Sequence, residues 1–259
     1  MPAQSATVAV DRDHHVAYLL RLGDSPLILG HRLSEWCAKA PILEEEMALT
    51  NMGLDLIGQA RALLAHAAAI RGTGTEDTLA YLRPEQDYTN LLLVEQPNGD
   101  FAVTMARQLF YAVFAEQQWR ALANSTDTVL AGIAAKAEKE AVYHVRHAAE
   151  WIIRLGDGTT ESHRRMQDAV DALWDYTGEM FACDGLEQDM AAAGIGADPS
   201  RFKAAWDETV DSVLAEATLT RPADGWMQAG GRHGRHTEHL GHILSEMQYL
   251  QRAYPGAQW

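Results

Sequence analysis

The spacing of apolar residues along the chain has the period of a helix. Aliphatic and aromatic residues return at steps of three and four, which places them on one side of a helix. No segment convincingly alternates apolar and polar residues as a half-buried strand does. We therefore expect an all-α protein. The predicted helices cover about residues 13–39, 43–70, 76–82, 100–123, 125–155, 160–182, 199–218 and 237–253.

The breaks between the long helices contain residues that commonly begin or end a helix. Ala40-Pro41 separates the first two long helices so closely that they must lie antiparallel. Asp100 is the expected N-cap of the third long helix, and Ser125 or Thr126 is the expected N-cap of the fourth. The third and fourth long helices are also joined by a short turn, so they form a second hairpin.

Two long hairpins joined by one longer crossover are typical of a ferritin-like four-helix bundle. The crossover covers about residues 71–99. We expect a single ferritin-like domain over residues 1–259, because no linker is long enough to divide the chain. Its core bundle would lie at about 13–155, with additional C-terminal helices at about 159–253.

Charge and composition exclude several classes of protein. The chain has 21 Lys and Arg against 36 Asp and Glu, a formal net charge of −15. Such a surface repels phosphate backbones and anionic lipid headgroups, which argues against nucleic acid or membrane partners. Cys37 and Cys183 are the only cysteines, too few for a disulfide framework or a cysteine-rich zinc site. Neither a secretory signal nor a run long enough to span a bilayer is present. We expect a cytoplasmic protein.

A ferritin-like bundle raises the question of a di-iron site. Such a site takes carboxylates from four helices, and two of the helices carry Glu-x-x-His, whose Glu and His share a helix face. No Glu in this sequence has a His three residues later, and among the Asp residues only Asp11 does, in Asp11-x-x-His14. That pair lies at the start of the first helix rather than in its middle. The di-iron signature is absent.

Neutral side chains occupy the inner faces where such ligands would lie. Gln59 is the one strongly polar residue in the inner row of the second long helix, and His144 interrupts a row of small and apolar residues in the fourth. The pairs Leu56/Gln59 and Ala141/His144 have the spacing of Glu and His in a metal protein. Buried carboxylates without a cation cost several kcal/mol each, so their absence fits a bundle without metal. We interpret Gln59 and His144 as hydrogen-bonded residues of a packed core.

Six segments of the sequence resemble a known family. They are LRLGD (20–24), RLSEWCAKAP (32–41), GLDLIGQAR (53–61), NLLLVEQPNGDFA (90–102), HTEHLG (236–241) and SEMQYLQR (245–252). In these segments the chain resembles the PaaC family, the C subunits of phenylacetyl-CoA 1,2-epoxidases. The resemblance extends from about Tyr18 to Trp259, nearly the whole chain.

The resemblance implies a place in a multicomponent bacterial monooxygenase. That complex epoxidises the aromatic ring of phenylacetyl-CoA in phenylacetate catabolism. A related ferritin-like protein, PaaA, carries the di-iron centre and binds the substrate. A reductase with FAD and an iron–sulfur cluster supplies electrons from NADPH. PaaC is a structural companion of PaaA, so the implied partners are PaaA, the other epoxidase subunits and the reductase. We expect part of the interface with PaaA on the first two helices.

The resemblance also implies which residues stand at the ligand positions of PaaA. Residues 55–59 match an Asp-Glu-Ala-Gly-His motif in the second helix, and residues 139–144 match Lys-Glu-Glu-x-Phe-His in the fourth. The ligand positions of the first and third helices correspond more loosely. The vestigial di-iron positions are then Leu29, Leu56, Gln59, Ala112, Ala141 and His144. The expectation for this chain is therefore no metal, no cofactor and no catalytic residue.

An alternative is a divergent ferritin-like metallo-oxygenase with its own non-standard metal site. The residues available to it are His144, Glu140, Asp55 and His147. An iron store would need the same ligands as the di-iron enzyme, and it fails for the same reason. Elemental analysis of the isolated chain separates the enzyme from the scaffold.

Four histidines near the C-terminus are spaced in threes and resemble a metal-binding comb. They are His233, His236, His239 and His242. Neighbours three apart on a helix could share an ion, but the same helix has a sound apolar stripe from Leu240 to Leu250. A packing or partner-facing role is the better interpretation, and the role of the four histidines stays open. Gly230-Gly231, just before them, is interpreted as a flexible turn.

Overall fold

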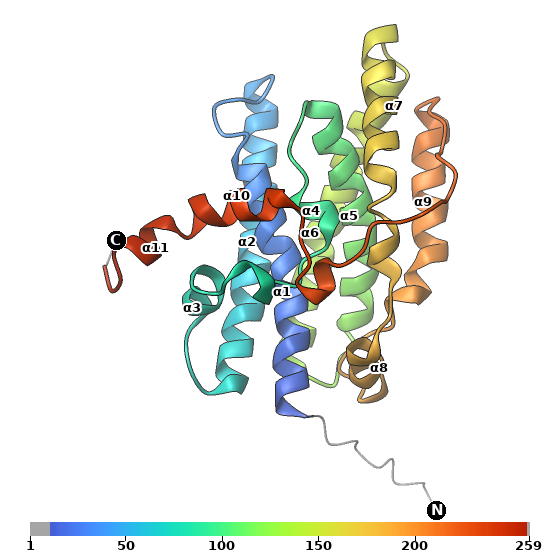
Figure 1. Cartoon of the computed structure of the whole chain (residues 1–259). Helices are drawn as coiled ribbons and strands as arrows, with labels where there is room; N and C mark the ends of the chain where they lie inside the picture. The colour runs from blue at the N-terminus through green and yellow to red at the C-terminus, as the bar shows by residue number, and fades with distance from the viewer. Residues whose placement is uncertain (1–10, 258–259) are drawn as a thin grey trace, which may run out of the picture.

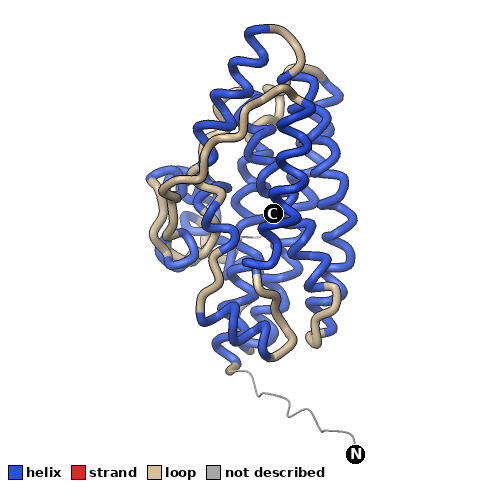
Figure 2. Tube along the Cα trace, turned by 90° about the vertical axis from the view of Figure 1, so that its right-hand side faces the viewer, coloured by secondary structure: helices blue, strands red, loops and turns tan. Residues whose placement is uncertain are grey.

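The computed structural model describes residues 11–257, and every regular element in that range is helical. Figure 2 shows helices joined by loops along the whole described trace. This confirms the all-α prediction. No helix among the described residues is long and apolar enough to cross a membrane.

Four long helices form the centre of the fold, and Figure 1 shows them side by side. They are α1 (Arg12–Ser34), α2 (Leu43–Arg71), α5 (Phe101–Leu122) and α6 (Thr128–Gly156). Helix α1 packs along α2, α5 packs along α6, and α2 also contacts α6. These are the two predicted hairpins of the ferritin-like bundle.

The ends of the long helices differ from the prediction in two places. Helix α1 ends at Ser34 rather than Lys39, because the chain turns there and the Trp36 indole donates to Thr104 Oγ1 of α5 at 3.0 Å. The N-cap of α6 is Asp127 rather than Ser125 or Thr126. Ser125 instead donates its hydroxyl to Ile195 O at 2.7 Å. The predicted N-cap of α5, Asp100, is confirmed.

The crossover between the hairpins contains three short helices. They are α3 (Glu76–Tyr81), the 3₁₀ turn η1 (Glu85–Asp87) and α4 (Leu92–Glu95). The sequence predicts only α3. Helix α4 is a single turn, too short to have a detectable apolar period. Its residues Leu92 to Glu95 are all buried, so the crossover is part of the packed interior.

The C-terminal half adds helices around the four-helix bundle. The α-helices are α7 (Thr160–Trp174), α8 (Gly185–Ala192), α9 (Lys203–Glu216), α10 (Glu238–Met247) and α11 (Tyr249–Ala253). The 3₁₀ turns are η2 (Gly178–Phe181), η3 (Pro199–Phe202) and η4 (Gly231–His233). Helices α7 and α9 pack on α5 and α6, and an extended segment then crosses the bundle to α10 (Figure 1). We call residues 219–237 the C-terminal strap.

One of these helices ends earlier than predicted, and a second is interrupted in its middle. The predicted helix 160–182 stops at Trp174. The Thr177 hydroxyl donates to Trp174 O at 2.8 Å, and Gly178 follows. The predicted helix 237–253 is broken at Gln248, whose side chain donates to Arg83 O at 3.0 Å and to Tyr88 Oη at 2.9 Å. A local hydrogen bond accompanies the end of α7, whereas tertiary hydrogen bonds interrupt the C-terminal helix at Gln248.

A hydrophobic core runs through the bundle and the added helices as one cluster from Val16 to Leu244. Between α5, α7 and α9 it is aromatic. The Trp206 indole donates to Phe110 O at 2.9 Å, and the ring centroids of Trp174 and Trp206 lie 5.8 Å apart. Trp226 on the strap is exposed instead. The single-domain assignment stays a prediction.

Candidate functional site

The centre of the four-helix bundle is the first candidate site, because ferritin-like enzymes hold metal there. All six residues predicted to stand at vestigial di-iron positions are buried, namely Leu29, Leu56, Gln59, Ala112, Ala141 and His144. Four of the six are aliphatic and offer no ligand atom. The remaining donors are one amide and one imidazole. This donor set does not fit a pair of iron ions, which needs four carboxylates and two imidazoles.

The two polar residues of the centre do not pair with each other. The Gln59 amide donates to Glu140 Oε2 at 2.9 Å, and its own oxygen has no partner. The His144 imidazole lies 3.2 Å from Asp55 Oδ2. Both contacts join α2 to α6 at the edge of the centre. The two side chains are thus hydrogen-bonded within a packed bundle, each to a different carboxylate.

The alternative metal set is distributed over separate ion pairs. His147 Nε2 lies 2.9 Å from Glu45 Oε2, Glu140 also contacts Lys136, and His144 contacts Asp55. Within residues 11–257 these side chains do not come together as a group of three ligands. Glu45 is moreover buried rather than part of a solvated helix start. Asp11-x-x-His14 is not a metal pair either, since Asp11 caps α1 and His14 lies 3.3 Å from Asp189.

A group that sequence patterns missed lies at one end of the bundle. His15 of α1, His66 of α2 and Asp127 before α6 place one ligand atom each within 4.8 Å of the others. His15 and His66 approach Asp127 Oδ2 at 2.9 and 2.6 Å. Burial acts to raise the pKa of Asp127, but hydrogen bonds from His66 and from the backbone N–H groups of Leu130 and Val129 outweigh it and hold the pKa below its ordinary value.

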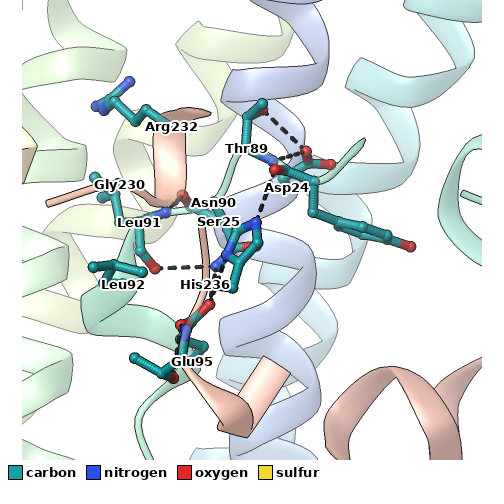
Figure 3. Close-up of polar contacts among 12 residues, drawn as sticks. Asp24, Ser25, Thr89, Asn90, Leu91, Leu92, Glu95, Gly230, Arg232 and His236 are labelled. Atoms are coloured by element: carbon teal, nitrogen blue, oxygen red, sulfur yellow. Dashed lines mark hydrogen bonds and ion pairs between the residues drawn. The ribbon is translucent and has the colours of Figure 1, made fainter. Parts of the chain in front are cut away.

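A second cluster of buried polar groups fixes the C-terminal strap to the crossover, and Figure 3 shows it. Glu95 of α4 is fully buried and accepts four hydrogen bonds. They come from Asn90 Nδ2 and His236 Nδ1 at 3.0 Å, and from Thr237 N at 2.7 Å and Thr237 Oγ1 at 2.8 Å. One carboxylate therefore joins two segments that lie 141 residues apart in the sequence.

Two further carboxylates, Glu179 and Glu187, hold the strap near Glu95, and we call the three carboxylates with their donors the strap cluster. Glu179 of η2 accepts from the backbone N–H groups of Leu92 at 2.9 Å and Gly230 at 2.8 Å. Glu187 of α8 contacts the guanidinium groups of Arg232 at 2.7 Å and Arg21 at 2.8 Å. Each buried carboxylate thus has several donors around it, which offsets the loss of hydration.

Gly230-Gly231 is not a flexible turn. A Cβ at Gly231 would lie 2.2 Å from Asn90 O and 3.1 Å from Leu92 N, so only glycine allows the strap to approach the crossover this closely. Gly234 has φ +70°, and a Cβ there would lie 2.2 Å from Gln86 O. The glycines are needed for close packing of two backbone segments.

The four C-terminal histidines do not form a metal comb. The His236 side chain is fully buried and uses both ring nitrogens, since Nδ1 donates to Glu95 and Nε2 donates to Tyr88 O at 2.9 Å. Burial acts to lower the pKa of His236, but its hydrogen bonds to Glu95 and Tyr88 raise the pKa above the ordinary value of 6.5. His233 and His242 are exposed. Packing is therefore the role of His236.

The outer face of α2 carries a third feature, a group of exposed apolar side chains. It includes Ile42, Leu43, Met47 and Leu54, and each is at least half exposed. A separate groove of about 390 Å³ lies between α2 and α6, lined by Gly58, Ala62, Val129 and Gly132 among others. Helix α1, by contrast, is buried without interruption from Arg21 to Gly30. We call Ile42, Leu43, Met47 and Leu54 the α2 patch.

Comparison with known proteins places this structure in a family. A family model described as "Phenylacetic acid catabolic protein", which covers PaaA and PaaC, matches residues 1–259. The chain belongs to this family. Among curated members, the C subunit of 1,2-phenylacetyl-CoA epoxidase from Escherichia coli (strain K12) is 51% identical over 243 residues. That alignment covers 94% of this chain and 98% of the relative, which confirms the resemblance seen in the sequence.

Three of the segments that carry the family resemblance contact the crossover or the strap. Asp24 from LRLGD accepts from Thr89 N at 2.9 Å and forms an ion pair with Arg83. Glu95 from NLLLVEQPNGDFA contacts His236 from HTEHLG. The recognisable motifs of this family member therefore include the residues that close its crossover and strap, and not a metal centre.

Proposed function

We propose that this chain is the non-catalytic structural component of a phenylacetyl-CoA 1,2-epoxidase. In this role it pairs with the homologous catalytic protein PaaA and stabilises it. The observation that carries the proposal is the bundle centre, where aliphatic groups at Leu29, Leu56, Ala112 and Ala141 fill the ligand positions. A complete ferritin-like fold with an inert centre fits assembly better than chemistry. The relative named as the C subunit of a 1,2-phenylacetyl-CoA epoxidase supports it.

The remaining components of the proposed complex hold the cofactors. The di-iron centre belongs to PaaA, and FAD and an iron–sulfur cluster belong to the reductase. This chain takes no part in oxygen activation or electron transfer, and it works in the cytoplasm. The net charge of −15 makes nucleic acids and anionic membranes unsuitable partners.

The α2 patch is the best-supported place for contact with PaaA. Large exposed apolar groups gathered on one helix commonly mark a protein interface. Interfaces of obligate partners bury more than about 2,000 Å² in total and have apolar centres. The sequence predicts a contribution from helix α1 as well, but the middle of α1 is already covered by this chain. We therefore expect the contact with PaaA on the outer face of α2.

Reconstitution with one component omitted tests the proposal. We expect PaaA with the reductase and the remaining components to lose most epoxidation activity, or to precipitate, when this chain is left out. Adding the purified chain should restore both solubility and turnover. Full activity of PaaA without this chain would overturn the scaffold role. Two iron ions bound between α2 and α6 of the isolated chain, with oxygenase activity, would replace it with the metallo-oxygenase.

A pair of matched variants tests the place of the interface. Leu54→Glu puts a charge into the α2 patch, and Trp226→Glu puts the same charge on a similarly exposed apolar residue of the strap. Both should fold, because neither side chain is buried. Only Leu54→Glu should weaken co-purification with PaaA. If Trp226→Glu weakens it instead, the assignment to α2 is wrong and the scaffold role stands.

A further inference from the structure

Helix α1 begins, α2 approaches its C-terminus and α6 begins at one end of the bundle (Figure 1). The side chains of His15, His66 and Asp127 converge there. His15 Nε2 and His66 Nε2 both point at one oxygen, Asp127 Oδ2, at 2.9 and 2.6 Å. The two imidazole rings meet edge to face, with their centroids 6.0 Å apart. Two imidazole nitrogens and one carboxylate oxygen are thus presented to a common point by three different helices.

The carboxylate is fixed before any ligand arrives. Asp127 Oδ1 accepts from the backbone N–H groups of Val129 at 3.0 Å and Leu130 at 3.1 Å as the N-cap of α6. Its other oxygen, Oδ2, is left for the two histidines. Such outer contacts orient a metal ligand and strengthen its binding. The three side chains are between 9% and 16% exposed, so an ion can reach them from solvent.

We propose that His15, His66 and Asp127 form a Zn²⁺ site, with His15 Nε2, His66 Nε2 and Asp127 Oδ2 as ligands and water in the fourth position. Imidazole nitrogen and carboxylate oxygen are donors that zinc takes in tetrahedral sites. With metal–ligand bonds of about 2.0–2.2 Å, tetrahedral donors lie about 3.3–3.6 Å apart. The present distances of 2.9 and 2.6 Å to Asp127 Oδ2 therefore need to open by about 0.4–1 Å.

Proton balance does not oppose the binding. In the metal-free chain each Nε2 carries the proton that it donates to the ionised Asp127. Zinc needs the lone pair of Nε2, so a ring that binds the ion carries its proton on Nδ1 instead. The ion then replaces two hydrogen bonds with three coordinate bonds.

The proposed site is independent of the bundle centre and of the scaffold role. It joins the first turn of α1, the last turns of α2 and the N-terminus of α6. An ion bound there would connect both hairpins of the bundle at one end. Because it binds the folded chain and not the unfolded one, it would raise the unfolding temperature with zinc concentration.

Titration of the full-length chain, prepared without a histidine tag and stripped with a chelator, tests the site. Zn²⁺ affinity is measured by competition with a chromophoric chelator. Co²⁺ serves as the spectroscopic substitute, because four-coordinate Co²⁺ absorbs strongly in the visible range. We expect one equivalent of either metal, the visible bands of four-coordinate cobalt, and a higher unfolding temperature with zinc.

Three variants make the result specific. His66→Gln and Asp127→Asn each remove one ligand, and Asn remains a good N-cap for α6. Since loss of an outer contact already weakens metal binding by about 10–100-fold, loss of a ligand should weaken it more than about 100-fold. His14→Gln changes the neighbouring exposed histidine and should leave the affinity unchanged. Circular dichroism and the unfolding temperature without metal confirm that each variant folds.

Three outcomes would overturn the site. The first is no saturable binding by the unaltered chain, which would leave a hydrogen-bonded contact only. The second is equal affinity in His66→Gln and Asp127→Asn variants that fold. The third is binding that disappears in a His239→Gln/His242→Gln variant, which would place the ion at the C-terminal helix. None of these outcomes affects the reconstitution test of the scaffold role.

Discussion

The bundle centre and the strap cluster differ in whether they contain buried carboxylates. In the centre, Leu56 and Ala141, which the family resemblance predicts to stand at ligand positions, are buried aliphatic side chains. In the strap cluster, Glu95, Glu179 and Glu187 are buried and retained. The difference lies in their donors, since each retained carboxylate receives several hydrogen bonds from backbone or side-chain groups. A carboxylate persists in this interior where N–H groups replace its hydration.

Glu95→Ala gives the largest effect that this comparison predicts. It leaves His236, Asn90 and Thr237 without their buried acceptor. Removing one partner of a buried charged pair costs about 3–5 kcal/mol, and urea denaturation measures that loss of unfolding free energy. Glu150→Ala on the exposed side of α6 is the control, with an expected change within about 0.5 kcal/mol. Equal losses in the two variants would refute the special role of Glu95.

Leu56→Glu adds a buried carboxyl group to the bundle centre, whereas Glu95→Ala removes one from the strap cluster. The new carboxyl group enters a site without prepared donors, so we expect a loss of about 3 kcal/mol or more at pH 7. Burial would raise its pKa above the unfolded value, so stability falls as pH rises and the loss is smaller at pH 5. Leu56→Gln should show no such pH dependence. A stable Leu56→Glu chain at pH 7 would mean that the centre is already hydrated or paired.

The pH dependence of stability should report the His236–Glu95 pair. The raised pKa of His236 means that the folded chain keeps this proton at pH values where the unfolded chain has lost it. Its stabilisation is complete below the unfolded pKa of about 6.5 and is lost as pH rises through the folded pKa, at about 1.4 kcal/mol for each pH unit that separates the two pKa values. Urea denaturation between pH 6 and 9 measures this slope. A His236→Gln chain should lack it, and an unchanged slope would assign the effect to another group.

Asp55→Asn gives the smallest effect. Asp55 is 35% exposed and 3.2 Å from His144, and such partly exposed pairs contribute less than about 1 kcal/mol. Thermal denaturation should therefore show little change. A large loss, together with loss of bound iron, would instead support the metal-ligand role of Asp55 that the alternative function requires.

The sequence predicts the bundle because its long helices are strongly periodic and their breaks contain recognisable residues. It also predicts that the di-iron ligands are absent, since this depends only on which residues occupy local motifs. It does not predict the strap cluster. Glu95 and His236 are 141 residues apart in the sequence, and no local pattern connects them. The histidine comb draws attention to His236 for the wrong reason, because three-residue spacing says nothing about a distant carboxylate.

The group formed by His15, His66 and Asp127 escapes sequence analysis for a related reason. Metal motifs are recognised when two ligands share one helical face, whereas these three residues come from three segments. Asp127 is also obscured by two neighbouring candidates for the same N-cap, Ser125 and Thr126. The early end of α1 and the break at Gln248 depend on tertiary hydrogen bonds, which helical periodicity does not contain.

The union of Glu95 with His236 has a consequence for biosynthesis. A ribosome makes the crossover long before it makes the strap, so Glu95 leaves the exit tunnel without the imidazole, the hydroxyl and the backbone N–H that later surround it. The two hairpins of the nascent chain can form early, because their contacts are local. The last step of maturation must wait until translation is nearly complete. A chain that ends before residue 236 therefore cannot give Glu95 its donors from the strap.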